Sequence, residues 1–357
     1  MKVLYAIQGT GNGHIARARE IVPILSRMCQ LDLFVSGSNS QVQLPHEVKF
    51  RSKGLSIFYD KSGGVSLTKT VANIRLKGLT REIRELPVEK YDLVINDFEF
   101  ISAYAALLKG VTCIGFGHQA AFHSAATPRP RRRDLLGELI LKHYAPANLA
   151  IGLHFDRYAP SIYTPVIRSE VRSLIPQTSR HFTVYLPHYD DKLLISILTE
   201  QKDCYWHVFT KNTRFVNTHK NVTLLPIDSK NFTQSLANSN GLITGAGFES
   251  PAEAMFLGKK VLALPIKGQY EQKCNAKALK MMGVTIVKKI GKRFSQKLRT
   301  WIETAQPIAV NYPDITEQIL ESMLSKIDLS HSVGSKALAS PPLFGQIDWL
   351  RKLNVWM

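Results

Sequence analysis

Short apolar runs typical of buried strands alternate with helical patterns along nearly the whole chain. Such runs lie at residues 3–7, 31–36, 93–96, 112–116, 149–153, 182–186, 204–209, 241–244 and 260–264. Helical patterns separate many of them, at residues 67–86, 101–108, 192–200 and 252–256. This alternation is the pattern of parallel sheets that carry helices on both faces, so the sequence predicts an α/β fold.

This number of strands favours two sheets over one. A chain of 357 residues with 45% hydrophobic content can also form two hydrophobic cores. We therefore predict two doubly wound Rossmann-like domains that face a cleft. The segment "YAPSIYTPVIRSEVRSLIPQ", residues 158–177, has three prolines and no strong period, which is typical of a linker. The expected domains are residues 1–165 and 166–329, followed by a linker and C-terminal tail at 330–357.

The first apolar run leads into the glycine-rich turn "GTGNGH" and then into a helical pattern. Strand, glycine turn and helix form a unit whose helix N-terminus offers free amides to an anion. A dinucleotide site would have glycine where His14 stands and an acid at the end of the second strand, where Ser36 and Gly37 occur. We therefore exclude a nicotinamide or flavin site. The ordinary alternative for His14 is a capping or solvated residue in the first helical turn.

Composition narrows the class of protein further. The four cysteines show no metal or redox spacing, which fits a reducing cytoplasm. The N-terminal apolar run is too short for a signal peptide, and no stretch of about 18 apolar residues is present. The formal net charge of +18 favours an anionic partner such as phosphates, an acidic polymer or an anionic membrane surface.

The second half of the chain repeats the strand, turn and helix unit in "GLITGAGFESPAEAMF". Gly245 and Gly247 form the turn, and Pro251 occupies a position favoured in the first turn of a helix. Ser250 can cap that helix or bind a phosphate there. One such turn is weak evidence, but two of them in two doubly wound domains point to a ligand at the carboxyl ends of the strands.

At these motifs the chain resembles the two-domain "B" fold of UDP-sugar glycosyltransferases. The resemblance is to the family of the bacterial peptidoglycan N-acetylglucosaminyltransferase and, more distantly, to plant UDP-glycosyltransferases. It is carried by "GTGNGH", "GFGHQAAF", "TPVIRSEV" and "GFESPAE" through "GQYEQKCNA", and it spans most of residues 1–320. The resemblance implies an inverting, metal-independent transfer of a hexosyl or N-acetylhexosaminyl group from a UDP-sugar to a hydroxyl acceptor, with no further cofactor.

The resemblance also assigns donor-binding residues. It implies that Glu253 binds the ribose hydroxyls and that Gly247 and Ser250, with Gly245, face the diphosphate. Glu271, Gln272 and Asn275 would lie at the transferred sugar. The ordinary alternatives are a solvated helix residue for Glu253 and a helix cap for Asn275. In one respect the chain departs from the family, because "VYLPHYDDK" has no glycine where a further glycine-rich loop is often found.

On the acceptor side, the resemblance implies that His14 is the general base. An acceptor hydroxyl needs a base, and histidine titrates near neutral pH. Asp97 in "DLVINDFEF" matches the aspartate that orients this histidine in the plant relatives. The alternative for Asp97 is a strand-end residue that caps the next helix. Gly11, Gly13, His118 and Gln119 are expected to line the cleft, and no metal site is expected.

Two basic clusters suggest where an anionic partner would bind. Nine lysines and arginines and no acid lie between residues 272 and 302, and "RPRRRD" spans residues 129–134. They fit a solvated face, or contact with an anionic membrane that carries a lipid-linked or glycan acceptor. The expected location is cytoplasmic and peripheral on the inner face of the membrane. Two alternatives remain: a UDP-sugar hydrolase or 2-epimerase of the same fold, and a basic nucleic-acid-binding protein. No nucleic-acid-binding motif supports the second of these.

Overall fold

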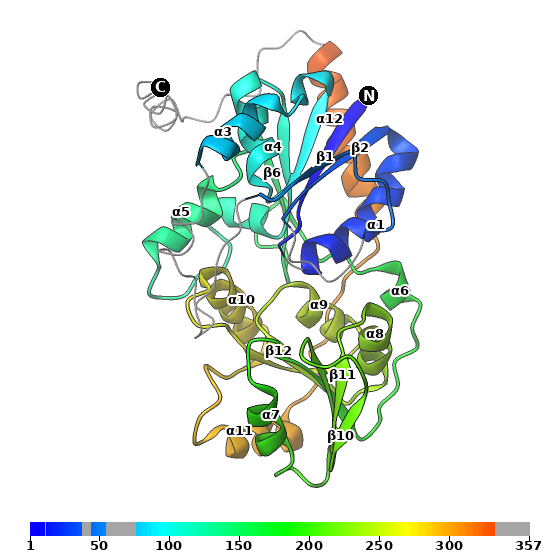
Figure 1. The fold of residues 1–357 in the computed structure, drawn as a ribbon, viewed down its shortest axis with the longest axis vertical. Coiled ribbons are helices and arrows are strands. Elements are labelled where there is room, and N and C mark those ends of the chain that lie inside the picture. Colours follow the sequence, from blue (N-terminus) through cyan, green and yellow to red (C-terminus); the bar gives the residue numbers. More distant parts are fainter. Residues whose placement is uncertain (11, 38–43, 55–75, 333–357) are drawn as a thin grey trace.

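The computed structural model describes residues 1–10, 12–37, 44–54 and 76–332, which form two α/β units stacked end to end (Figure 1). Each unit is built around one sheet, as the sequence predicts, and each sheet has seven strands. Three predicted features lie wholly or partly outside these residues: Gly11, the part of the tail at 333–357, and the first part of the helix expected at 67–86.

The first sheet has the strand order β3-β2-β1-β4-β5-β6-β7, and all its pairs are parallel. Its strands are β1 (Lys2–Gln8), β2 (Gln30–Ser36), β3 (Phe50–Ser52), β4 (Leu93–Asp97), β5 (Cys113–Gly117), β6 (Leu149–Leu153) and β7 (Ile162–Tyr163). The helices of this unit are α1 (Asn12–Met28), α3 (Leu76–Glu85), α4 (Phe100–Lys109) and α5 (Leu135–His143), with short 3-10 turns at Val88–Lys90 and Gln119–His123.

The second sheet has the order β10-β11-β9-β8-β12-β13-β14, and only the β10–β11 pair is antiparallel among the described pairs. Its strands are β8 (His181–Tyr185), β9 (Tyr205–Thr210), β10 (Asn217–His219), β11 (Val222–Pro226), β12 (Gly241–Gly245), β13 (Lys260–Leu264) and β14 (Thr285–Ile286). The accompanying helices are α7 (Asp191–Leu198), α8 (Ser229–Asn238), α9 (Glu249–Phe256), α10 (Tyr270–Met281) and α11 (Phe294–Thr304).

Hydrophobic periodicity accounts for these elements. The helix α1 buries the stripe Ile15, Ala18, Ile21, Val22 and Leu25 against strands that are apolar on both faces. Each strand predicted from an apolar run is present within about two residues of its expected ends. The expected linker at 158–177 is only partly irregular, because Ile162–Tyr163 pairs with β6 and Ser169–Arg172 forms the short helix α6.

The last described helix, α12 (Thr316–Ser332), returns to the first unit and lies against α1 (Figure 1). Ile319, Leu320 and Met323 are buried in the same apolar cluster as the stripe of α1. The Tyr312 hydroxyl donates to the Phe155 carbonyl at 3.0 Å. The domain boundaries expected at 165/166 and 329/330 stay a proposal.

Both sheets reverse their strand order at one point, between β1 and β4 in the first sheet and between β8 and β12 in the second. In doubly wound folds, the loops at the carboxyl ends of the strands flanking such a point form the ligand site. The two glycine turns of the sequence follow β1 and β12. In the described part of the chain, no helix is both long and apolar enough to cross a membrane.

Candidate active site

A cleft with a cavity volume of about 330 Å³ lies where the carboxyl ends of the two sheets meet. We call it the central cleft. The first unit lines it with the β1–α1 turn, Phe98 and Gln119, and the second with the segments that follow β8 and β12 and with the start of α10. Ligand sites are commonly roughly 300–1,000 Å³, so the central cleft lies at the lower end of the range for a small-molecule site.

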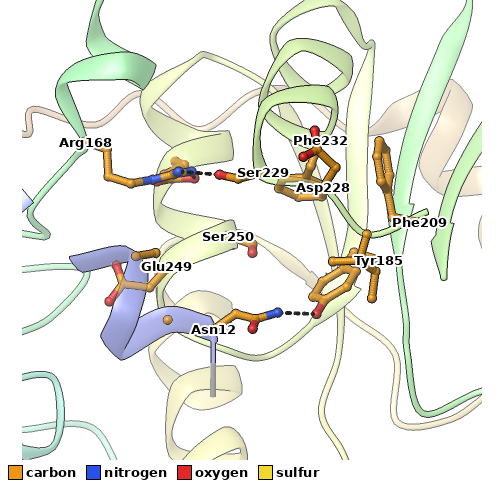
Figure 2. Close-up of a pocket in the computed structure, with 13 residues that line it drawn as sticks. Asn12, Arg168, Tyr185, Phe209, Asp228, Ser229, Phe232, Glu249 and Ser250 are labelled. Carbon is orange, nitrogen blue, oxygen red and sulfur yellow. Dashed lines mark hydrogen bonds and ion pairs between the residues drawn. The ribbon is translucent and has the colours of Figure 1, made fainter. Parts of the chain in front are cut away.

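A smaller cavity of about 90 Å³ adjoins the central cleft and shares Asn12, Gly13, Tyr185, Glu249 and Ser250 with it. We call it the side pocket. Figure 2 shows the rings of Tyr185, Phe209 and Phe232 on one side of it and Ser250 and Glu249 across from them. Its aromatic side offers stacking surface, and its polar side offers hydroxyl and carboxylate groups. This combination suits a nucleoside.

His14 and Asp97, predicted as a pair from the sequence, are in contact. His14 Nδ1 lies 2.9 Å from Asp97 Oδ1, and the His14 side chain lines the central cleft with 14% of its surface exposed. Arg17 Nη2 also lies 3.1 Å from His14 Nδ1, but it makes shorter contacts with Asp97. Since a carboxylate can only accept, we assign the proton of the neutral ring to Nδ1. The other ring nitrogen, Nε2, is then the basic atom of His14.

Arg17 is the centre of the charged group behind His14. Its guanidinium donates Nη2 to both Asp97 oxygens, at 2.7 and 2.8 Å, and Nε to Oδ2 at 3.2 Å. Nη1 donates to Glu249 of the second unit. Burial raises the pKa of Asp97, but Arg17 and then His14 outweigh burial and hold that pKa below its ordinary value. Asp97 is therefore an anion that fixes the tautomer of His14.

Two unusual backbone features lie next to the Asp97 carboxylate. Phe98 has a φ of 55°, a conformation that costs a bulky residue about 1–3 kcal/mol. A Cβ added at Gly117, at the end of β5, would lie 2.5 Å from Asp97 Oδ1. The glycine in "GFGHQ" therefore allows the end of β5 to approach the carboxylate closely.

Glu249 faces the central cleft and the side pocket at once. Burial raises the pKa of Glu249 to about 7 against the effect of Arg17, and Glu253 and Asp97 add to the rise. Gly13 makes room for it, because a Cβ there would lie 3.1 Å from Glu249 Cγ. Near neutral pH this carboxyl group can therefore change its charge beside a bound ligand.

The residues predicted to face a diphosphate lie together. Gly245, Gly247 and Ser250 line the central cleft, and a side chain at Gly247 would meet no atom within 4 Å. The backbone of this turn is therefore open to a ligand. Gln272 also lines the cleft, where its Oε1 accepts from the amides of Ala246 at 3.2 Å and Ile266 at 2.9 Å.

Glu253 lines the side pocket but has a partner that the sequence did not reveal. Arg168 donates Nε to Glu253 Oε1 at 2.6 Å and Nη2 to Oε2 at 2.9 Å. Arg168 also contacts Glu170 and Ser229. A carboxylate has about four acceptor sites, so this pairing leaves Glu253 with capacity for further hydroxyl donors.

Of the remaining predicted residues, some line the central cleft and one does not. Gln119 donates Nε2 to Glu271 Oε2 at 3.0 Å across the central cleft. His118 lies within 3.0 Å of the Leu153 carbonyl through Nδ1 and within 2.8 Å of Asn275 Oδ1 through Nε2. Asn275 is fully buried and lines neither cavity. Through His118 and Ala246 it connects the two units, and its expected place near the sugar stays a prediction.

Sequence reasoning missed Arg17, Arg168, Glu249 and His188, all of which line a cavity. Arg17 carried a signal, because it stands beside Ala18 and Ile21 on the apolar side of α1, where a charged residue needs a partner. Among the residues that the structure describes, no group of His, Cys, Asp and Glu side chains could hold a metal ion.

Comparison with known proteins places this geometry in a family. Residues 1–303 match the family described as "Glycosyl transferase family 1". A protein of Methanosarcina mazei described as an uncharacterized glycosyltransferase is 20% identical over 324 residues, which cover 79% of this chain and 84% of the relative.

Solved structures share the fold. MurG of Acinetobacter baumannii is 15% identical with a TM-score of 0.56, covering 91% of this chain and 99% of that one. UGT2 of Phytolacca americana, complexed with UDP-2-fluoro-glucose and pterostilbene, is 14% identical with a TM-score of 0.54, covering 97% of this chain and 98% of that one. These likenesses confirm the two-domain fold expected from the sequence.

The buried contact between Arg17 and Asp97 leads to a stability prediction. Arg17→Leu leaves the Asp97 carboxylate without its main counterion and should lower the free energy of unfolding by about 3–5 kcal/mol. Arg27→Leu on the same helix is the matched control, because Arg27 and its partner Glu317 are both more than half exposed. It should cost at most about 1 kcal/mol. Denaturant unfolding measures both, and equal losses would contradict the assignment.

Proposed function

The chain belongs to glycosyl transferase family 1, and from this premise we propose that it moves a hexosyl or N-acetylhexosaminyl group from a UDP-sugar to a hydroxyl acceptor. The observation that carries the proposal is the 2.9 Å contact of His14 with Asp97 at the wall of the central cleft. In this proposal His14 is the base. It lines the cleft between the two units, where an acceptor hydroxyl can approach a UDP-sugar that is bound by the second unit.

In the proposed reaction the acceptor hydroxyl gives its proton to His14 Nε2 while its oxygen attacks the anomeric carbon of the sugar. The bond between that carbon and the diphosphate oxygen breaks, its electron pair leaves with UDP, and the configuration inverts. Asp97 stabilises the imidazolium that forms on His14. No step requires a metal ion, because the amides at the start of α9, beside the open Gly247, can stabilise the departing diphosphate.

We place the donor in the side pocket and the adjoining part of the central cleft. The uracil would stack among Tyr185, Phe209 and Phe232, and the ribose hydroxyls would donate to Glu253. The diphosphate would lie at Gly247 and Ser250, and the sugar would extend toward Glu271 and Gln272. The likeness to a relative solved with a UDP-sugar supports this placement.

The acceptor we propose is a glycolipid or cell-envelope glycan, reached from the cytoplasmic side of an anionic membrane. Exposed cations support this proposal. Lys288, Lys289, Lys292 and Arg293 are all exposed, as are the three arginines at 131–133. Arg129 of the same "RPRRRD" run is turned inward, where it pairs with Glu138 at 3.0 Å.

Nucleotide binding tests the donor class. UDP should raise the melting temperature of the protein more than ADP or NAD does, since a ligand that binds only the folded state stabilises it. Glu253→Gln should weaken UDP binding about tenfold through loss of charge-assisted bonds. Glu317→Gln should leave it unchanged, because Glu317 lines neither cavity and pairs with Arg27. Equal stabilisation by ADP and UDP would reject the donor. Rapid turnover of UDP-N-acetylhexosamine without an acceptor would favour a hydrolase or 2-epimerase.

The role of His14 can be separated from nucleotide binding. His14→Ala should lower kcat by about 10²–10⁴-fold, the usual range for a positioned base, with little change in the Kd for UDP. Asp97→Asn should also slow the reaction, and the double variant should be little worse than His14→Ala alone. A single-turnover rate near that of the wild type, in folded His14→Ala, would show that the histidine is not the base.

Glu249 predicts a pH dependence of donor binding. With its pKa near 7, the carboxyl group is mostly neutral below that pH and repels a bound diphosphate above it. The wild type should therefore bind a UDP-sugar less tightly as the pH rises from about 6 to about 8, while Glu249→Gln should show a flatter profile. A UDP-sugar is the right probe, because each of its two phosphates keeps one ionised oxygen throughout this range and the charge of the ligand stays constant. The same slope in both proteins, measured by calorimetry, would contradict the assignment.

A further inference from the structure

The segment that follows β8 is a part of the central cleft that has no role yet. It reads Leu186, Pro187, His188, and both Pro187 and His188 line the cleft. The strand β8 flanks the point where the second sheet reverses its order, directly beside β12 and its glycine turn. Side chains in this segment therefore face the same ligand as the amides of the Gly245–Gly247 turn.

His188 is a partly buried side chain with unused hydrogen-bonding groups. Neither ring nitrogen has a hydrogen-bond partner among the described residues, and both are shielded from solvent. Its ring packs against Tyr189, with the ring centroids 4.5 Å apart. Unsatisfied polar atoms in a folded protein cost free energy and call for a partner such as a water molecule, an ion or a ligand.

The other two histidines of the central cleft are already engaged. His14 Nδ1 is held by Asp97, and both ring nitrogens of His118 lie within hydrogen-bond distance of protein oxygens. Of the three imidazoles that line the cleft, His188 alone lacks a partner at both nitrogens, as far as the described residues show.

The side chains that line the central cleft supply too little positive charge to neutralise a bound diphosphate. Arg17 is its one lysine or arginine among the described residues, and Asp97 and Glu249 already share that guanidinium. Glu249 and Glu271 add carboxyl groups to the same wall. A diphosphate therefore needs a further donor, and an imidazole that can gain a proton is suited to supply one.

We propose that His188 binds the diphosphate of the nucleotide sugar by donating a ring N–H to a phosphate oxygen. This inference rests on the proposed function, and it gives the segment after β8 the task of holding phosphate with a side chain. Burial lowers the pKa of His188 to about 4, so the free protein holds it neutral, with one N–H to donate. The negative charge of the ligand favours the imidazolium and strengthens the contact.

The test compares nucleotides that differ only in phosphate. Calorimetry gives the Kd of uridine, UMP and UDP for the wild type, His188→Phe, His188→Gln and, as the control, His219→Phe at an exposed histidine on β10. His188→Phe should weaken UDP about tenfold, the effect of losing a charge-assisted bond, and leave uridine unchanged. His188→Gln keeps an N–H and should lose less. His219→Phe should match the wild type.

The ligand-free stability of His188→Phe provides a second readout. If the histidine is kept for a ligand, replacing two unpaired nitrogens by an apolar ring should leave the melting temperature unchanged or higher. A lower melting temperature with unchanged UDP affinity would show a structural role and overturn the inference. An equal loss for uridine and UDP would also overturn it, because the contact would then be to the nucleoside. Absence of UDP binding by the wild type would reject the proposed function itself.

Discussion

A guanidinium taken out of water must be surrounded by acceptors, and in this protein that requirement joins the two halves of the chain. Arg17 is almost fully buried, and its donors go to Asp97 at the end of β4 and to Glu249 at the start of α9. Moving either half would leave a buried charge unmatched, at a cost of several kcal/mol. The cleft, the orientation of His14 and the position of α9 all depend on this one side chain.

The same arginine contacts two carboxyl groups whose pKa values shift in opposite directions. Asp97 is fully buried, receives three guanidinium contacts and keeps its charge. Glu249 receives one contact and stands near other carboxylates, so its pKa rises to about 7. One acid is thus a permanent anion, and the other is able to exchange a proton with the cleft. Two acids with divergent affinity for protons are a common arrangement in enzyme active sites.

Short sequence patterns predicted the strands and the turns, because these depend on neighbouring residues. Apolar runs indicated the strands, and glycine turns indicated that His14 and Gly247 lie at the carboxyl ends of β1 and β12. Long-range pairing was harder to foresee, since 232 positions separate Arg17 from Glu249 and nothing near either residue marks the other. Asn275 shows the same limit, because nothing in its motif indicated the contacts that it makes with His118 of the first unit and with Ala246. Short edge strands such as Ile162–Tyr163 carry too few residues for a detectable period.

The return of α12 to α1 has a consequence for how the protein is made. The apolar surface that Ile319, Leu320 and Met323 cover belongs to the unit that the ribosome produces first. Domains usually fold as they emerge, in order from the N-terminus. Here the first unit leaves the exit tunnel with an uncovered stripe, and that stripe is closed only after the whole second unit has been synthesised. Completion of the first fold is thereby coupled to translation of the last described helix.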